Sequence, residues 1–352
     1  MPIILEDMSP DNTLQAVVEE DTGVVFFYIW GGRDSSFGVR SCWVRNLLPA
    51  PEQAWGKDIP SGKAPPLPRK HCKHPDGAPP LISERLRVVW FEQGDGAALL
   101  EGDDILAVIP GWSGQDGFNG FARDCNGTSE LCWELEKGNV LSEQVHSALD
   151  FWKAWDSSPT PWERVQQSVI ESVEKSVGAH KKYFAIDRGE WPPMGLLQIS
   201  VPGGTAFVTV GVSLRPQPSV DGYVDEPSLY RRIELGMCVG GDLGQAQLNK
   251  IGGYVSAQTH FPWSLFTWLG PGHTINCNLF PGFSSVVLTP QPLGAPPVKL
   301  ASFRGDPVTL LWMIPITEPE LRFAMDNSSE ALLSQMAEYY PYWIHRTRSS
   351  VV

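Results

Sequence analysis

Proline and glycine interrupt this chain at short intervals, and this limits what it can fold into. The sequence contains 31 prolines and 34 glycines among 352 residues. Proline fixes φ and lacks a backbone donor, while glycine admits left-handed turns, so both residues tend to end regular elements. Their frequency favours many turns and short strands over a helical bundle. The length predicts about two domains.

The charge balance argues against several kinds of partner. The 40 acidic and 27 basic residues give a net charge of -13. Nucleic acid and anionic membranes attract a basic face, and the densest basic stretch, PRKHCKH at 68–74, is short. We therefore expect neither a nucleic-acid nor a membrane partner. A basic partner protein would suit the charge.

The N-terminus and the cysteines predict a cytoplasmic protein. The opening MPIILEDMSPDNT has no basic region followed by a long apolar one, as a secretory signal would. No window approaches the ~18 apolar residues of a membrane-spanning helix. The six cysteines form no CxxC pair, and we expect them to be reduced and partly buried.

Strands are predicted in both halves of the chain from runs of β-branched and aromatic residues. The short connection PGGT predicts that two of them form a hairpin, at 195–201 and 206–214. A Pro-rich stretch at 48–81 has little periodicity and predicts a long loop, and a Gly-rich loop is predicted at 111–127. The other predicted strands lie at 23–30, 85–92, 103–110, 230–239, 284–290 and 308–316.

Helices are predicted in the middle and at the end of the chain. Apolar residues at spacings of three and four continue from Ser142 to Trp155. TPWE at 160–163 has the pattern of a capping box, and Thr317 with Glu320 repeats it near the C-terminus, before a helix that restarts after Asn327. The mixture of strands and helices predicts an α+β fold. We place the boundary in the Ser- and Pro-rich segment 156–161, which gives an N-terminal α+β part at 1–157 and a second part at 158–352.

Motifs for catalysis, cofactors and metals are incomplete. GWSG at 111–114 lacks the second glycine of a nucleophile elbow, because Gln115 stands there. GKDIPSGKA at 56–64 has the wrong spacing for a phosphate loop and no Ser or Thr after its lysine. HCKH at 71–74 lacks a second half-site for zinc. We therefore expect no catalytic residue, no cofactor and no metal.

The segment FTWLGPGHTI at 266–275 is the most unusual in the second half. Gly270 and Gly272 flank a proline between two apolar segments, which predicts a sharp turn. Trp268 is expected to pack under this turn, with His273 bonded to backbone or exposed at a sheet end. A structural turn is our main interpretation. A contact with a partner remains an alternative, and so does a role in catalysis or metal binding.

The same segment, together with VTLLWMIPITEPELRFAMDNSSEALLSQM at 308–336, resembles the suppressor-of-fused family. The resemblance rests on a hydrophobic strand that ends in a PIT-type turn and runs into a helix. It extends over roughly 160–340, with the strands at 195–214 and 230–239 resembling the central sheet of the family. It implies a mixed or antiparallel sheet with packed helices. The N-terminal part, especially 103–125, resembles an extension found beside this domain in some bacterial relatives.

The resemblance implies a protein-binding module and no enzyme. The animal member grips an extended peptide as an added strand, a mode in which backbone hydrogen bonds supply affinity and side-chain pockets supply selection. It has a further C-terminal domain for which we expect no counterpart here, so its developmental role is not expected to transfer. Bacterial relatives are thought of as immunity proteins that neutralise polymorphic toxins by occlusion. The expected partner is thus a protein or extended peptide, in particular a basic toxin.

Candidate partner-binding residues fall in two groups. The first group lies in the turn and consists of Trp268, Gly270, Gly272 and His273. The second lies in the Gly-rich loop and consists of Asp116, Arg123 and Asp124. An alternative is a hydrolase or other enzyme that uses this loop, at 111–127, with the same three polar residues in its site. The loop could also serve only for tight turns, with a surface ion pair.

Overall fold

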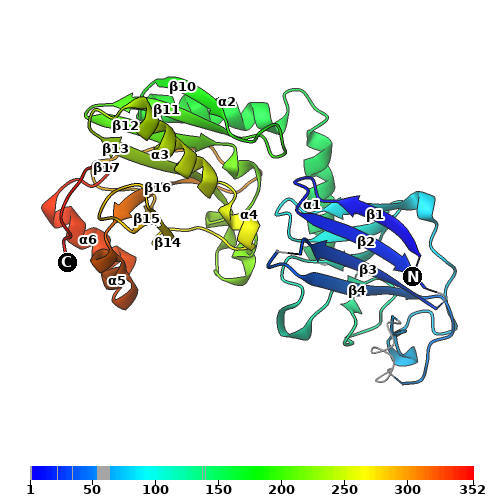
Figure 1. Ribbon diagram of the computed structural model, residues 1–352. Helices are drawn as coiled ribbons and strands as arrows, with labels where there is room; N and C mark the ends of the chain where they lie inside the picture. Colours follow the sequence, from blue (N-terminus) through cyan, green and yellow to red (C-terminus); the bar gives the residue numbers. More distant parts are fainter. Residues whose placement is uncertain (1, 22, 34, 54–63, 137, 139) are drawn as a thin grey trace. The chain divides into compact units, whose positions relative to one another are not determined.

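The computed structural model describes residues 2–21, 23–33, 35–53, 64–136, 138 and 140–352. The chain forms two compact units, Met1–Ser157 and Ser158–Val352, called unit 1 and unit 2 below (Figure 1). Most of the segment that we compared with a phosphate loop, 56–63, lies outside the described residues.

In its described residues, unit 1 has two sheets and one α-helix. Its first sheet has the order β1-β2-β3-β4 and is antiparallel throughout. Its second sheet has the order β5-β6-β7-β8-β9, with only the short β8 and β9 parallel. The strands are β1 Ile3–Met8, β2 Leu14–Glu20, β3 Val24–Gly31, β4 Val39–Asn46, β5 Leu86–Trp90, β6 Ala97–Glu101, β7 Asp104–Ile109, β8 Phe121–Ala122 and β9 Trp133–Glu134, and the helix is α1 Val140–Ala154.

Part of the core of unit 1 forms where α1 packs on its second sheet. Val145 and Ala148 of α1 lie in one buried cluster with Val89, Leu100 and Val108 of the sheet. Val145 and Leu149, which packs against the same cluster, belong to the apolar series at spacings of three and four that predicted this helix. The helix begins at Val140, two residues before the predicted Ser142.

Unit 2 is built on one eight-stranded mixed sheet. The order is β10-β11-β12-β13-β16-β15-β14, with β17 paired to β13. Only the pairings of β13 with β16 and β17 are parallel. The strands are β10 His180–Ala185, β11 Gly195–Val201, β12 Gly204–Val210, β13 Arg232–Gly240, β14 Thr274–Asn276, β15 Ser285–Thr289, β16 Val308–Ile316 and β17 Ile344–His345.

Five helices accompany this sheet. Helix α3 lies across it in Figure 1, and its Ile251 and Val255 are buried with Leu196, Phe207 and Met237 of the strands. Both predicted capping boxes are present, at Thr160 for α2 and at Thr317 for α5. The helices are α2 Pro161–Ser176, α3 Gln245–Gln258, α4 Phe261–Leu265, α5 Glu318–Asp326 and α6 Ser329–Tyr339.

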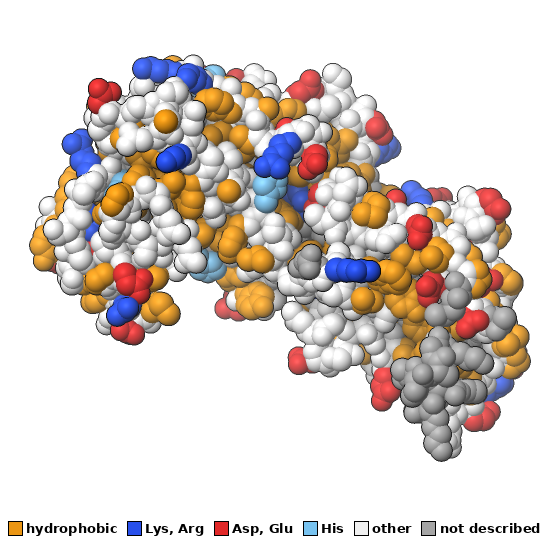
Figure 2. Space-filling view, viewed as in Figure 1, with side chains coloured by type: hydrophobic (Ala, Val, Ile, Leu, Met, Phe, Trp, Pro, Cys, Tyr) orange, Lys and Arg blue, Asp and Glu red, His pale blue; other side chains and the backbone are white. Residues whose placement is uncertain are grey.

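The α+β fold and the mixed sheet are therefore confirmed, with local corrections. The strand predicted at 206–214 ends at Val210, because Gly211 adopts a φ of 100°. A Cβ on Gly211 would lie 2.6 Å from the Trp162 ring, so only glycine fits there. Helix α3 was not predicted at all. On the face shown in Figure 2, lysine and arginine side chains are scattered and do not gather in one area.

Candidate protein-interaction surface

The predicted turn in unit 2 exists and is tightly built. Gly272 has a φ of 84°, and a Cβ on Gly270 would lie 2.4 Å from the Trp268 ring. The Gly272 N–H donates to the Leu288 carbonyl at 2.8 Å, and the Leu288 N–H donates to the His273 carbonyl at 2.9 Å. These bonds continue the pairing of β14 with β15 into the turn. The two glycines are thus required by backbone conformation and by close packing.

A buried glutamine fixes the entrance to this turn. Gln217 is 1% exposed, and its amide makes two bonds with the backbone of Leu269. Its Nε2 donates to the Leu269 carbonyl at 2.9 Å, while its Oε1 accepts from the Leu269 N–H at 2.8 Å. Gln217 Nε2 also donates to the Tyr230 carbonyl, and the Tyr230 ring meets the Trp268 ring edge-on at 5.6 Å. The turn is therefore held in one orientation.

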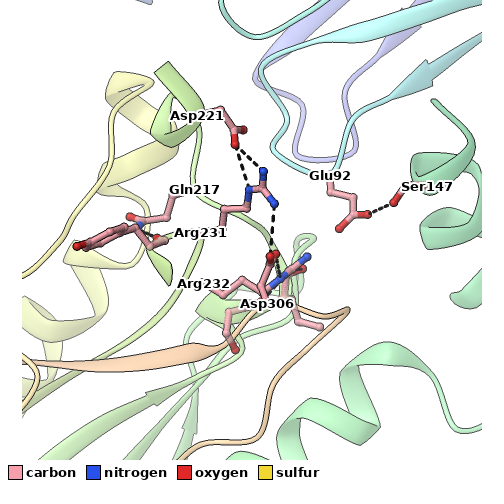
Figure 3. Close-up of polar contacts among 10 residues, drawn as sticks. Glu92, Ser147, Gln217, Asp221, Arg231, Arg232 and Asp306 are labelled. Carbon is pink, nitrogen blue, oxygen red and sulfur yellow. Dashed lines mark hydrogen bonds and ion pairs between the residues drawn. The ribbon is translucent and has the colours of Figure 1, made fainter. Parts of the chain in front are cut away.

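Arginines beside Tyr230 stabilise the segment that carries Gln217. Arg231 bonds to Asp221 at 2.6 Å and to Asp306 at 3.4 Å, as Figure 3 shows. Arg232, 1% exposed, bonds to the same Asp306 at 3.2 Å and to the Ser213 carbonyl at 3.0 Å. Because a buried charge needs such partners, this cluster fixes the start of β13. In unit 1, Figure 3 shows a separate bond between Glu92 and Ser147 at 3.4 Å.

His273 is a neutral side chain at pH 7. Burial lowers the pKa of its imidazole, and a backbone hydrogen bond at Trp268 opposes this only in part. Its Nδ1 accepts from the Gly270 N–H at 3.3 Å, which assigns the proton to Nε2. The ring centroid lies 4.4 Å from that of Trp268. His273 thus stabilises the turn.

Two hollows open on either side of Gly272. The first has a volume of about 400 Å³ and is lined by the turn, by Phe261 of α4 and by Ala324 and Met325 of α5. The second, of about 740 Å³, lies between the 288–295 segment and one face of α6, with Leu293 and Leu333 among its lining residues. Met325 is 77% exposed and Leu293 is 45% exposed. The turn with both hollows is called the turn surface below.

The N-terminus of α6 joins the turn to the helices. Ser328 caps α6 by accepting from the Ala331 N–H at 3.0 Å. Ser329 Oγ donates to the Gly272 carbonyl at 2.6 Å, so the helix and the turn share a direct bond. Asn327, the C-cap of α5, and Ser328, the N-cap of α6, thus form the break between the two helices that the sequence predicted.

The three predicted residues of unit 1 differ in their exposure and in their partners. Asp124 is 4% exposed and bonds to Arg45 and Arg123, both at 2.9 Å. Burial alone would raise the pKa of Asp124, but the hydrogen bonds and charges of the two arginines outweigh it and lower the pKa. Asp116 is exposed, with a φ of 48°. Arg123 and Asp124 thus stabilise the fold through ion pairs, although the Arg123 side chain remains 32% exposed, and Asp116 is exposed.

Ser113 of the loop at 111–127 is not presented as a nucleophile. The Ser113 side chain is 3% exposed and donates to the Asn119 carbonyl, so its oxygen points into the loop. In the first hollow His273 is the only ionisable group among the described lining residues. Among the described residues, no group of three or more His, Cys, Asp or Glu could hold a metal ion. No described helix has the length and apolarity to cross a bilayer.

Several residues of the turn surface were missed by sequence reasoning. Gln217 lies 52 positions before Leu269, and nothing in the sequence pairs them. Met325 and Leu293 look like ordinary apolar residues of a helix and a loop. The Ser328–Ser329 pair before EALL was the one available signal, because serine is a favoured N-cap.

Comparison with known proteins gives one family. Residues 190–348 match the family model described as Suppressor of fused protein (SUFU), so the predicted resemblance is confirmed for most of unit 2. No curated protein matches the chain significantly.

Two solved structures are weakly similar. The Sufu–Fu complex crystal structure is 12% identical, with a TM-score of 0.39, over 53% of this chain and 92% of the other. The crystal structure of Drosophila Suppressor of Fused is 11% identical, with a TM-score of 0.37, over 53% of this chain and 51% of the other.

Proposed function

We propose that this chain is a cytoplasmic, non-catalytic protein-binding module, and that the turn surface of unit 2 receives the partner. The observation that carries the proposal is that the rigid turn at 268–273 lies between two hollows, inside the segment that matches the suppressor-of-fused model. Exposed apolar side chains beside a fixed backbone are typical of interaction sites. The site needs no cofactor to bind a protein.

The mode of binding that suits this surface is strand addition beside the turn. β14 has three residues, of which Thr274 and Asn276 are exposed, and it stands at the end of the sheet order. An extended peptide on this edge would gain backbone hydrogen bonds, while the hollows would accept its side chains. β10, at the other end of the order, is the alternative edge.

The more specific proposal is an immunity protein of a bacterium that neutralises a toxin by occlusion. The net charge of -13 supports it, because toxins that act on nucleic acid are often basic, and complementary charge speeds their encounter with an acidic protein. Of the unit 1 residues, Asp116 stays in the proposal as a partner contact. For Arg123 and Asp124 we propose only that they stabilise the loop.

Affinity capture from the native host, with the product of the adjacent reading frame included, tests this proposal. We expect one stoichiometric partner whose binding is lost in Met325→Glu or Leu293→Glu, since each substitution places a charge in one hollow. Phe184→Ala is the matched control, because Phe184 is 36% exposed on β10, at the opposite end of the sheet order.

The outcomes of this capture separate the alternatives. Loss of binding in the control, with Met325→Glu unaffected, would place the partner on the β10 edge and refute the turn surface. Capture of no stoichiometric partner, combined with turnover in a hydrolase screen that Asp124→Asn abolishes, would favour the enzyme.

A further inference from the structure

Four aromatic rings form a partly exposed patch on unit 1, far along the chain from the turn surface. Trp112 stacks on Phe118 with ring centroids 4.4 Å apart and planes 27° apart. Phe118 also meets Trp133 edge-on at 4.8 Å, and Phe121 contacts the other three rings at 5.0 to 6.0 Å. Trp112 is 39% exposed and Trp133 is 40% exposed, while Phe118 is 6% exposed. These residues are called the aromatic patch.

The backbone holds the aromatic patch in place. The Gly114 N–H donates to the Phe118 carbonyl at 2.7 Å, and the Trp133 N–H donates to the Gly120 carbonyl at 2.8 Å. Asn119 Nδ2 donates to the Glu130 carbonyl at 2.5 Å, which joins the loop before β8 to the loop before β9. The two tryptophans are therefore presented on a fixed base. Rigid aromatic residues lose little conformational entropy when a ligand binds.

Acidic residues accompany the rings. Asp116 is two residues from Phe118 and exposed, and Glu130 is tied through its carbonyl to Asn119. Among the described residues neither Asp116 nor Glu130 takes part in an ion pair. The nearest arginine in sequence, Arg123, is already bonded to Asp124 and also lies 3.6 Å from Asp104. Two basic side chains adjoin the patch, but each faces a carboxylate of its own: Arg40, which donates to the Gly111 carbonyl, faces Asp95, and Lys73 bonds to Glu134. Within the described part of the chain, the carboxylates of Asp116 and Glu130 thus remain without an ion pair.

We propose that the aromatic patch binds an arginine-bearing segment of a protein partner. An exposed tryptophan face attracts a cation through its quadrupole, most strongly when the cation is a guanidinium that can lie flat on the ring. Asp116 and Glu130 then supply carboxylates that accept hydrogen bonds from the same group. The overall charge of -13 favours such a segment over an acidic or neutral one.

This inference concerns a second surface of the proposed binding protein and can fail by itself. It uses residues of unit 1 only, and its test needs no native partner. A failed capture experiment would leave it standing, and its own failure would leave the turn surface standing.

Fluorescence anisotropy with a labelled peptide of alternating arginine and glycine tests the proposal on the full chain. The matched probe replaces each arginine by citrulline, which keeps the shape and removes the charge. We expect the arginine peptide to bind and the citrulline peptide to bind much more weakly. Trp112→Ala should weaken binding about tenfold, because it removes the outer ring of the stack. Asp116→Asn should weaken it about threefold.

Trp30→Ala is the control, because Trp30 is 37% exposed on β3 and contributes no ring to the patch. Its binding should match that of the unchanged chain, and circular dichroism should show all variants folded. Equal binding by the two peptides, or binding that survives Trp112→Ala and depends on salt alone, would overturn the proposal. Concentration-dependent dimers in light scattering that disappear in Trp112→Ala would also overturn it, since a second copy of the chain would then cover the patch.

Discussion

His345 is a buried histidine whose protonation is linked to folding. It is 8% exposed and lies against the rings of Phe280 and Phe283, with centroids at 4.2 and 4.6 Å. Burial, with a smaller contribution from the charge of Arg348, lowers the pKa of His345 to about 4. The unfolded chain binds a proton near pH 6.5, and the native protein does not. Stability is therefore lost as the pH falls from about 6.5 to about 4.

We predict that lowering the pH from about 6.5 to about 4 decreases the unfolding free energy of unit 2 by roughly 3 kcal/mol. Urea unfolding at several pH values in this range, monitored with a probe in unit 2, measures the decrease. His345→Leu should flatten the dependence, because the titrating group is gone, whereas His146→Gln, an exposed histidine of α1, should leave it unchanged. An equal slope in His345→Leu and in the unchanged chain would contradict the account.

Helix α3 shows at the scale of an element how packing overrides local pattern. It contains Gly252 and Gly253 in its interior, which is the reason that its periodicity was not recognised. Gly252 is buried against the sheet, where an added Cβ would lie 3.3 Å from Leu196 and from Phe207. Gly253 is exposed and an added Cβ meets nothing within 4 Å. The first glycine allows the helix to approach the sheet, and the second has no such role.

The two glycines therefore predict different outcomes for the same substitution. Gly253→Ala should stabilise unit 2 by about 0.5–1 kcal/mol, because alanine restricts the unfolded chain and favours the helix. Gly252→Ala should stabilise unit 2 less than Gly253→Ala, or destabilise it, because the side chains of Leu196 and Phe207 would have to move. Thermal unfolding of both variants decides this, and equal gains would show that α3 does not pack closely at Gly252.

Elements with strong local signals were predictable from the sequence, and those defined by distant contacts were not. Thr160 and Thr317 predict the starts of α2 and α5, because each capping threonine and its glutamate lie within four residues. β10 was missed because HKKYFA is charged and mostly exposed, as suits an edge strand. Likewise the two glycines predicted the turn from a local pattern. The bond of Arg45 to Asp124 was not predictable, because it joins residues 79 positions apart. No short pattern encodes such a pair.

At the scale of the whole molecule we predict that unit 2 folds without unit 1. Its sheet and helices form a compact unit from Ser158 onward, with a buried core of its own. Residues 158–352 expressed alone should give a cooperative thermal transition and a native-like near-ultraviolet circular dichroism spectrum. A chain that binds a hydrophobic dye and melts without cooperativity would contradict this prediction.

We propose above that the turn surface of unit 2 binds a protein partner. Hydrogen–deuterium exchange on the purified complex, compared with the free chain, tests it most directly. We expect slower exchange at 268–276 and in 324–337, where the turn, β14 and the α5–α6 helices line the two hollows, with β10 unchanged. Slower exchange confined to 180–185, or to residues remote from both hollows, would contradict it.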